Sequence, residues 1–235
     1  MTDRTAPIGI VTGLKFESAI VKRWSGVFGA NAPQIACAGG RADKAGDLAR
    51  GLVVDGVQAL VSFGIAGGLD PGLKAGTLVL PHGVKTADGG AVACDASWRG
   101  RFSGKLLSSI AVSEADLVSV TEPVMTPDAK RRLAETSGAG AVDVESAAVG
   151  TAAAERGVPF LVIRAIADTA EQALPAAALK ATGPDGSVSA ARALLAIAAR
   201  PGQTGDMLRL ARQTARAKRT LARVAHQGLP WFGLV

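Results

Sequence analysis

The stretch covering residues 141–170, AVDVESAAVGTAAAERGVPFLVIRAIADTA, constrains the fold more than any other part of the sequence. Its alanine-rich segment 147–156 predicts a helix, and Gly157 supplies a stop signal directly after it. The next run, 160–166, is almost wholly apolar and rich in branched residues, which is typical of a strand covered on both faces. Asp168 follows this strand. Because open parallel sheets bind ligands beyond the carboxyl ends of their strands, Asp168 is a candidate for chemistry.

Short apolar runs alternate with segments of helical spacing along the first 170 residues. The predicted strands are 8–12, 34–38, 59–63, 77–80, 91–94 and 117–120, and the predicted helices between them include 42–54 and 127–136. This alternation predicts an α/β domain with a mainly parallel sheet. We expect the domain to cover residues 1–203, and the Pro- and Gly-punctuated loop at 171–186 is long enough to cover an active site. A basic amphipathic helix and an apolar tail are expected over residues 204–235.

The composition bears on the cellular compartment of the protein and on the metal sites that it can form. Hydrophobic residues make up 48% of the 235 residues, so the chain can bury a large core. No apolar run reaches the length of a membrane span, and the first residues lack the pattern of a signal peptide, which predicts a cytoplasmic protein. With two cysteines and two histidines, neither a disulfide framework nor a Cys- or His-based metal site is indicated.

The net charge of +6 belongs to the C-terminal segment. Between Arg200 and His226 there are seven Lys or Arg residues and one acid, Asp206, and the rest of the chain is formally neutral. A basic amphipathic helix of this kind, followed by Trp231 and Phe232, suits an anionic membrane surface. Its apolar stripe could equally pack on the domain or on a dimer partner. Nucleic-acid binding is a weaker alternative, because no recognisable binding module accompanies the charge.

Three carboxylates flank the helix and strand of residues 141–170: Asp143, Glu145 and Asp168. Two of them have a structural alternative to a role in chemistry. Glu145 could simply open the helix, where the helix dipole favours an anion, and Asp168 could cap a turn. Arg164 lies inside the apolar strand, and because a buried Arg needs a partner, we expect an ion pair with one of these acids.

Glycines follow the strand predicted at 59–63, in the sequence GIAGG. They predict either a tight turn or a close approach of the backbone to a ligand. The spacing is not that of a dinucleotide-binding motif, and no phosphate-binding loop is present elsewhere in the chain.

Taken together, three motifs resemble the nucleoside phosphorylase and nucleosidase superfamily, and within it the methylthioadenosine/S-adenosylhomocysteine nucleosidases. They are IGIVTGLKFE near the start, SFGIAGGLDPGLKAGTLVLP in the middle, and VDVESAAV followed by VPFLVIRAIAD late in the chain. The resemblance covers roughly residues 8–170. It implies one α/β domain with a central mixed β-sheet, partly closed into a barrel and flanked by helices. It also implies cleavage of the N-glycosidic bond of nucleosides, with phosphate or water as the nucleophile, in a homodimer that needs no metal or organic cofactor.

The resemblance also implies roles for individual residues. Asp168 matches the acid that protonates the purine base as it departs, and Glu145 matches the glutamate that holds the ribose, with Val144 as the apolar residue beside it. Glu17 falls on the glutamate that positions the attacking water in the hydrolases. Its structural alternative is a solvated helix residue. The base-contacting loop falls at 123–125, which makes Pro123 and Val124 candidate base contacts.

If phosphate is the nucleophile, its candidate ligands are Gly13, Gly64 and Arg41, with Lys44 nearby. For Arg41 an exposed, unrelated position is the alternative.

The chain departs from the family pattern at three places. Ile65 stands where the hydrolases often have a Ser, and Ala167 stands where a Ser usually helps to orient the catalytic acid. The loop at 123–125 lacks the family's aromatic residue, which favours a larger or more apolar substrate.

The alanine- and arginine-rich C-terminal segment resembles that of the hopanoid-associated phosphorylases, which are thought to remove adenine from adenosylhopane, a lipid-linked purine nucleoside. The sequence therefore predicts a phosphorylase of that type, with phosphate as co-substrate and a possible contact with the inner membrane face through the C-terminal helix. Two alternatives remain: a hydrolytic nucleosidase acting on methylthioadenosine or a relative, and a non-catalytic protein on the same fold that associates with membranes or nucleic acid.

Overall fold

A computed structural model describes residues 7–25, 32–86, 88–106, 108–189, 195 and 201–228. Its strands are β1 (Ile8–Thr12), β2 (Gln34–Cys37), β3 (Ala59–Gly68), β4 (Leu78–Val79), β5 (Gly83–Thr86), β6 (Ala91–Ala93), β7 (Val112–Ser113), β8 (Leu117–Ser119), β9 (Ala141–Asp143) and β10 (Phe160–Asp168). Its helices are α1 (Lys15–Ser25), α2 (Ala42–Val54), α3 (Ala96–Ser103), α4 (Pro127–Ser137), α5 (Ser146–Arg156), α6 (Ala176–Ala181), the short 3-10 helix η2 (Pro201–Gln203) and α8 (Thr204–Gly228).

All the strands of this part of the chain belong to one mixed sheet. Its main path runs β6-β5-β8-β9-β3-β10-β4-β7, and β1 joins β2 to β3 beside this path. Most of the pairings are parallel, and the antiparallel ones join β10 to β4, β3 to β9 and β5 to β6. The predicted single-domain α/β fold with a mixed sheet flanked by helices is confirmed. Among the described strands the path ends at β6 and β7, so the sheet is open rather than closed into a barrel.

Strand β3 has two successive partners along one edge. Its first half pairs with β1, from Ala59 opposite Ile8 to Phe63 opposite Thr12. Beyond Phe63 this edge pairs with β9, where Gly67 lies opposite Val142, while the other edge pairs with β10. The strands β1 and β9 therefore separate at Phe63. This fork brings the segments that follow β1 and β9 close to the last residues of β3 and β10.

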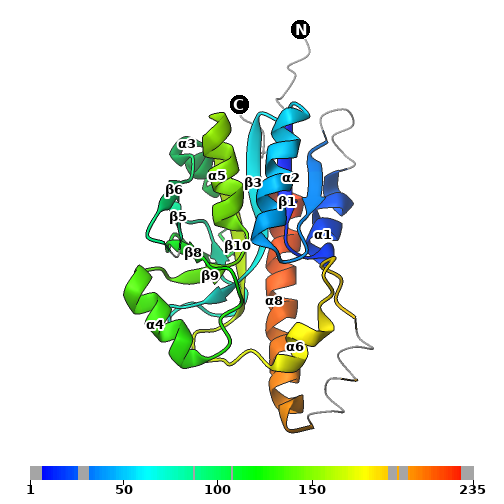
Figure 1. Cartoon of the computed structure of the whole chain (residues 1–235), viewed down its shortest axis with the longest axis vertical. Helices are drawn as coiled ribbons and strands as arrows, with labels where there is room; N and C mark the ends of the chain where they lie inside the picture. Colours follow the sequence, from blue (N-terminus) through cyan, green and yellow to red (C-terminus); the bar gives the residue numbers. More distant parts are fainter. Residues whose placement is uncertain are drawn as a thin grey trace.

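Helices cover both faces of the sheet. Figure 1 shows α2 and α5 side by side over one face, with α8 running behind β10 on the other. Alternation along the strands explains the two layers. Leu60 and Val162 belong to the apolar cluster that contains α2 and α5, whereas Val61 and Ile163 belong to the cluster that contains α1, α3 and α8. Strands buried on both faces read as the near-continuous apolar runs seen in the sequence.

The C-terminal helix α8 packs on the domain over its second half. Ala217, Leu221 and Val224 of the predicted apolar stripe are buried in the cluster beneath β10. The first half is much more open, and Leu208 is 51% exposed. Of the two interpretations of the stripe, packing on the domain therefore holds for these three residues. Trp231 and Phe232 lie outside the described residues. Within the described part of the chain, no helix combines the length and apolar character that crossing a membrane requires.

Several predicted elements differ from the observed ones. The strand predicted at 59–63 continues through the glycines as far as Gly68, so the tight turn expected there is wrong. The predicted loop 171–186 contains α6. Its Leu174 lines the pocket described below, and the Leu174 N–H donates to Met125 O at 2.8 Å. The short strand β5 and helix α3 were not predicted. The alanine and leucine spacing of residues 188–199 also predicts a helix, and this segment lies largely outside the described residues.

Candidate active site

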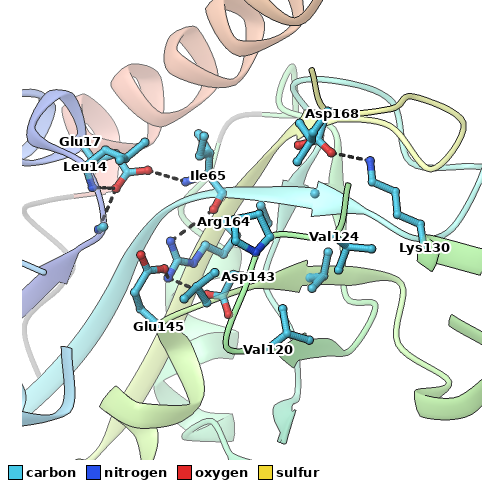
Figure 2. A pocket seen from close by; sticks show the side chains of 17 residues that line it. Leu14, Glu17, Ile65, Val120, Val124, Lys130, Asp143, Glu145, Arg164 and Asp168 are labelled. Carbon is cyan, nitrogen blue, oxygen red and sulfur yellow. Dashed lines mark hydrogen bonds and ion pairs between the residues drawn. The ribbon is translucent and has the colours of Figure 1, made fainter. Parts of the chain in front are cut away.

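A pocket of about 170 Å³ lies at the fork between β1 and β9. It is lined by Gly13, Leu14, Glu17, Ile65, Ala66, Gly67, Val120, Pro123, Val124, Lys130, Val142, Asp143, Val144, Glu145, Arg164, Asp168 and Leu174. In Figure 2, Glu17 and Asp168 lie on opposite sides of the view with Ile65 between them, and Glu145 lies below Glu17. The pocket thus combines an apolar lining with four carboxylates, Glu17, Asp143, Glu145 and Asp168, which come from three parts of the chain.

Glu17 is held by backbone N–H groups on both of its carboxylate oxygens. Because it lies in the first turn of α1, its side chain can reach back to the residues before the helix, as in a capping box. The N–H groups of Gly13 and Leu14 donate to Oε2 at 2.9 and 2.8 Å, and the N–H of Ile65 donates to Oε1 at 2.8 Å. Burial raises the pKa of Glu17, while Arg164 and these hydrogen bonds oppose the rise. The solvated alternative for Glu17 is wrong, since its exposed fraction is 1%.

Gly64 makes room for this carboxylate. A Cβ at position 64 would lie 2.6 Å from Glu17 Oε1 and 2.5 Å from Arg164 Nη1. Any side chain there would therefore displace one of the two charged groups. The glycine that follows Phe63 is explained by this close approach of side chains to the backbone of β3.

Arg164 joins Asp143 and Glu145 into one buried cluster. It lies on β10 and faces the start of α5, where its Nη2 is 2.6 Å from Asp143 Oδ2 and 3.4 Å from Glu145 Oε2. It also donates to the hydroxyls of Ser62 and Ser146 at 2.8 and 3.1 Å. Burial acts to lower the pKa of Arg164, but the neighbouring carboxylates raise it. The predicted ion pair is confirmed, and its nearer partner is Asp143.

Glu145 is the least engaged acid of this cluster. Asp143 accepts hydrogen bonds from Ser119 and Ser146, and it caps the start of α5, whereas the Glu145 side chain makes no cap hydrogen bond. Burial raises the pKa of Glu145 to about 7, despite the opposing charge of Arg164. Its carboxylate therefore retains capacity to accept hydrogen bonds from a ligand in the pocket.

Asp168 is paired with Lys130, a residue that the sequence analysis did not select. Asp168 is the last residue of β10, and Lys130 Nζ lies 2.5 Å from its Oδ2. Burial raises the pKa of Asp168, and the Lys130 ammonium opposes that rise. The Ala167 side chain, beside it in sequence, has no hydrogen-bonding group with which to orient this acid.

The structure brings together most of the predicted site residues. Those that line the pocket are Gly13, Glu17, Pro123, Val124, Val144, Glu145 and Asp168. Gly64 lies directly behind Glu17 and does not line the pocket. Arg41 is not part of it: its side chain is exposed and forms an ion pair with Asp43, also exposed. The prediction that Arg41 contacts a nucleophile in this pocket is therefore not supported, and the same holds for Lys44, which is also absent from the lining.

The groups present suit acid–base chemistry on an uncharged or cationic substrate. Within the described part of the chain, no group of three or more His, Cys, Asp or Glu side chains is arranged to hold a metal ion. The pocket's two cations, Lys130 and Arg164, are both engaged by carboxylates. A buried carboxyl with a raised pKa can carry a proton near neutral pH, and one held by N–H donors can orient a small polar molecule.

Comparison with known proteins identifies the family. The family model described as "Phosphorylase superfamily" matches residues 26–199 of this chain. The chain belongs to the phosphorylase superfamily. Several proteins of known structure have a similar fold. The methylthioadenosine/S-adenosylhomocysteine nucleosidase of Helicobacter pylori is 17% identical, with a TM-score of 0.69, and the match covers 97% of this chain and 96% of that one.

Two further solved structures give similar values. Futalosine hydrolase of Helicobacter pylori is 17% identical, with a TM-score of 0.66 over 94% of this chain and 97% of that one. The methylthioadenosine/S-adenosylhomocysteine nucleosidase of Neisseria meningitidis is 16% identical, with a TM-score of 0.68 over 94% and 98%. At these sequence identities the comparison shows a shared fold and no more. The superfamily assignment agrees with the resemblance found in the sequence motifs.

Proposed function

We propose that this member of the phosphorylase superfamily cleaves the N-glycosidic bond of a purine nucleoside. The observation that carries the proposal is that three of the four buried carboxylates around one pocket each lie in a different environment. Glu17 accepts backbone N–H groups, Glu145 lies beside Arg164 with spare acceptor capacity, and Asp168 is paired with Lys130. Cleavage of such a bond leaves positive charge on the sugar and electrons on the base, so it needs both an acid and an anion.

Each carboxylate then has one role. Asp168 donates a hydrogen bond or proton to N7 of the departing base, with Pro123 and Val124 beside the ring. Glu145 accepts hydrogen bonds from the ribose hydroxyls and stabilises the cationic sugar, with Val144 packed next to it. Glu17 orients the nucleophile on the far side of the sugar. The reaction needs no metal or organic cofactor.

Water is the nucleophile that the pocket favours, although the sequence analysis predicted phosphate. A phosphate dianion would meet Glu17 and Glu145 in this pocket, and the lining cations Lys130 and Arg164 already have carboxylate partners. Arg41, the predicted phosphate ligand, is exposed and paired with Asp43. A neutral water molecule avoids this repulsion, and a glutamate with a raised pKa suits its activation.

A lipid-linked nucleoside of the adenosylhopane kind is the substrate class that we favour. The pocket lining is largely apolar and includes Leu14, Val120 and Leu174, and the loop at 123–125 carries no aromatic residue. These features offer apolar surface to a substituent larger than a methylthio group. This choice also rests on the resemblance of the C-terminal segment to the hopanoid-associated phosphorylases.

The test is adenine release from adenosylhopane and from methylthioadenosine, each with and without phosphate. We expect adenine release that does not depend on phosphate and is faster from adenosylhopane. The other product should be ribose that is still attached to the lipid and carries a hydroxyl at its anomeric carbon. Phosphate-dependent release with a ribose 1-phosphate product would show that phosphate, and not water, is the nucleophile. Faster release from methylthioadenosine would refute the proposed lipid-linked substrate. Absence of release from either nucleoside, in a folded protein, would refute the activity and favour a binding role.

Peripheral membrane contact through α8 is the second part of the proposal. Its exposed arginines follow one helix face, and three of them, Arg216, Arg219 and Arg223, line a surface groove of about 610 Å³ together with Lys74. No acidic residue lines this groove. A cationic stripe of this kind attracts anionic lipid head groups at about 1 kcal/mol per residue near the surface.

Vesicle co-sedimentation tests the membrane contact. We expect binding to vesicles that contain phosphatidylglycerol but not to pure phosphatidylcholine, and a loss of binding when the three groove arginines are changed to Gln. A variant with the exposed Arg101, Arg131 and Arg132, which lie outside the groove, changed to Gln loses the same three charges and is the control. Equal binding by the groove variant would refute the contact.

The homodimer that the family resemblance implies stays a prediction, to be checked by light scattering.

A further inference from the structure

Lys130 occupies a position that local helix physics disfavours. It lies in the first turns of α4, after the capping Thr126 and Pro127. The start of a helix favours anions, so a cation there gains nothing from the helix dipole. Lys130 is also 1% exposed, and burial of an ammonium group is costly unless it is paired and fully hydrogen-bonded. Neither helix formation nor core packing accounts for a lysine at this position.

The Lys130 ammonium is fully satisfied by one short segment of chain. It donates to Asp168 Oδ2 at 2.5 Å, to the carbonyl of Thr169 at 2.7 Å and to the carbonyl of Gln172 at 3.0 Å. These three bonds use all three N–H donors of a lysine. Lys130 therefore has no donor left for a ligand, and all its interactions hold the end of β10 and the turn after it.

Only one oxygen of Asp168 takes part in this arrangement. Lys130 binds Oδ2, while Oδ1 forms no hydrogen bond within the described part of the chain. In Figure 2, Lys130 lies on one side of Asp168, whereas Ile65, Arg164 and Glu17 lie on the other. Oδ1 is thereby the oxygen left for a ligand, and the torsion that would exchange the two oxygens is restrained by the ion pair.

We propose that Lys130 is a positioning residue for Asp168: it fixes which carboxyl oxygen meets the departing base and keeps a positive charge behind the acid throughout the reaction. This takes over the orienting task for which Ala167 has no suitable group. The proposal rests on the proposed function, because it presumes that Asp168 is the acid. It goes beyond that function by assigning a lysine that does not touch the substrate.

The charge has its own consequence for the pH dependence of the reaction. Lys130 is the charged group whose charge acts on the Asp168 carboxyl, while Glu17, Asp143, Glu145 and Arg164 form the separate cluster on β3, β9 and β10. Without Lys130, burial acts unopposed and the pKa of Asp168 rises further. Activity that requires protonated Asp168 would then persist to higher pH.

The experiment compares Lys130→Met, Lys130→Arg and the exposed neighbour variant Arg131→Met. For Lys130→Met we expect kcat to fall at least tenfold at the pH optimum with KM changed less than threefold, and the alkaline limb of the kcat profile to move up by at least one pH unit. Lys130→Arg keeps the charge, so its alkaline limb should stay within half a unit of wild type. Arg131→Met should match wild type. Lys130→Gln, which still can donate to Oδ2, replaces the Met variant if that protein is insoluble.

A carboxyl ¹³C NMR titration of Asp168 separates this proposal from the proposed function. The Asp168 signal, identified by its loss in Asp168→Asn, should titrate at least one pH unit higher in Lys130→Met than in wild type, whether or not a substrate is known. An unchanged Asp168 titration, or a fall in kcat that leaves the alkaline limb in place, would overturn the positioning role. If the titration shifts but the protein cleaves no nucleoside, the effect of Lys130 on Asp168 would be supported and only the proposed function would be refuted.

Discussion

Changing Glu145 to Gln is expected to stabilise the protein at alkaline pH while it removes the ribose-binding anion. Burial raises the pKa of Glu145 from 4.5 to about 7 in the folded protein. The group's contribution to stability is therefore fully present below pH 4.5 and is lost as the pH rises through 7. At about 1.4 kcal/mol for each pH unit, the full loss is about 3 kcal/mol, and about 2.5 kcal/mol of it falls between pH 5 and pH 8.

The assay is thermal and urea unfolding of wild type and Glu145→Gln at pH 5, 6, 7 and 8. The stability difference between the two proteins should change by about 2.5 kcal/mol in favour of the Gln variant over this range, which is roughly 5–10 °C in Tm for a chain of this size. The substitution also alters the contact with Arg164, and this changes the stability by the same amount at each pH, so it does not affect the pH dependence of the difference. Arg164 still has Asp143 as a partner at 2.6 Å in both proteins. Glu155→Gln, on the exposed end of the same helix, is the control. Parallel stability curves for wild type and Glu145→Gln would refute the reasoning.

Three further substitutions test the site and the packing. Asp168→Asn should lower kcat by about two to four orders of magnitude, the usual scale for loss of an acid–base group, with an intact fold by circular dichroism; near-normal turnover would exclude Asp168 as the acid. Gly64→Ala places a methyl group 2.6 Å from Glu17 Oε1, so it should cost about 1–3 kcal/mol by calorimetry and lower kcat, and a neutral effect on both would contradict the described packing. Leu221→Ala should destabilise by about 2–5 kcal/mol, whereas Leu208→Ala, 51% exposed on the same helix, should change stability by less than about 0.5 kcal/mol; equal effects would show that α8 does not pack as described.

Sequence reasoning located elements whose signals are local. The strand at 8–12 and the helix at 42–54 have the predicted bounds, because an apolar run or helical spacing and the flanking breakers define each of them. The Arg164 ion pair was predictable for a different reason: an Arg inside an apolar strand has to find a carboxylate nearby. Glycine was the main source of error, since Gly64 and its neighbours continue a strand in which neighbouring charged side chains leave no room for a side chain.

Lys130 could not be found in this way. In sequence it is one of several charged residues on a helix, and such residues are usually solvated. What buries it is a partner 38 positions away, at the end of another element. Arg41 is the opposite case: its glycine neighbours and its place after a strand suggested an anion ligand, and tertiary structure leaves it at the surface. In both cases the local sequence pattern does not indicate which distant segment of the chain, if any, packs against the residue.

The pairing of β3 with β10 sets the order in which this protein can become functional during synthesis. Leu60 pairs with Phe160, which is 100 positions later, so no chain shorter than about 168 residues can hold Asp168, Arg164 and Glu17 together. Until β10 has left the ribosome, the apolar β3 lacks its partner along one full edge, and an unpaired edge of this kind favours association between chains. Such distant contacts also slow folding. Chaperone dependence should therefore be greatest for nascent chains between about residues 70 and 160, and a single step, the docking of β10, should complete the sheet and the site together.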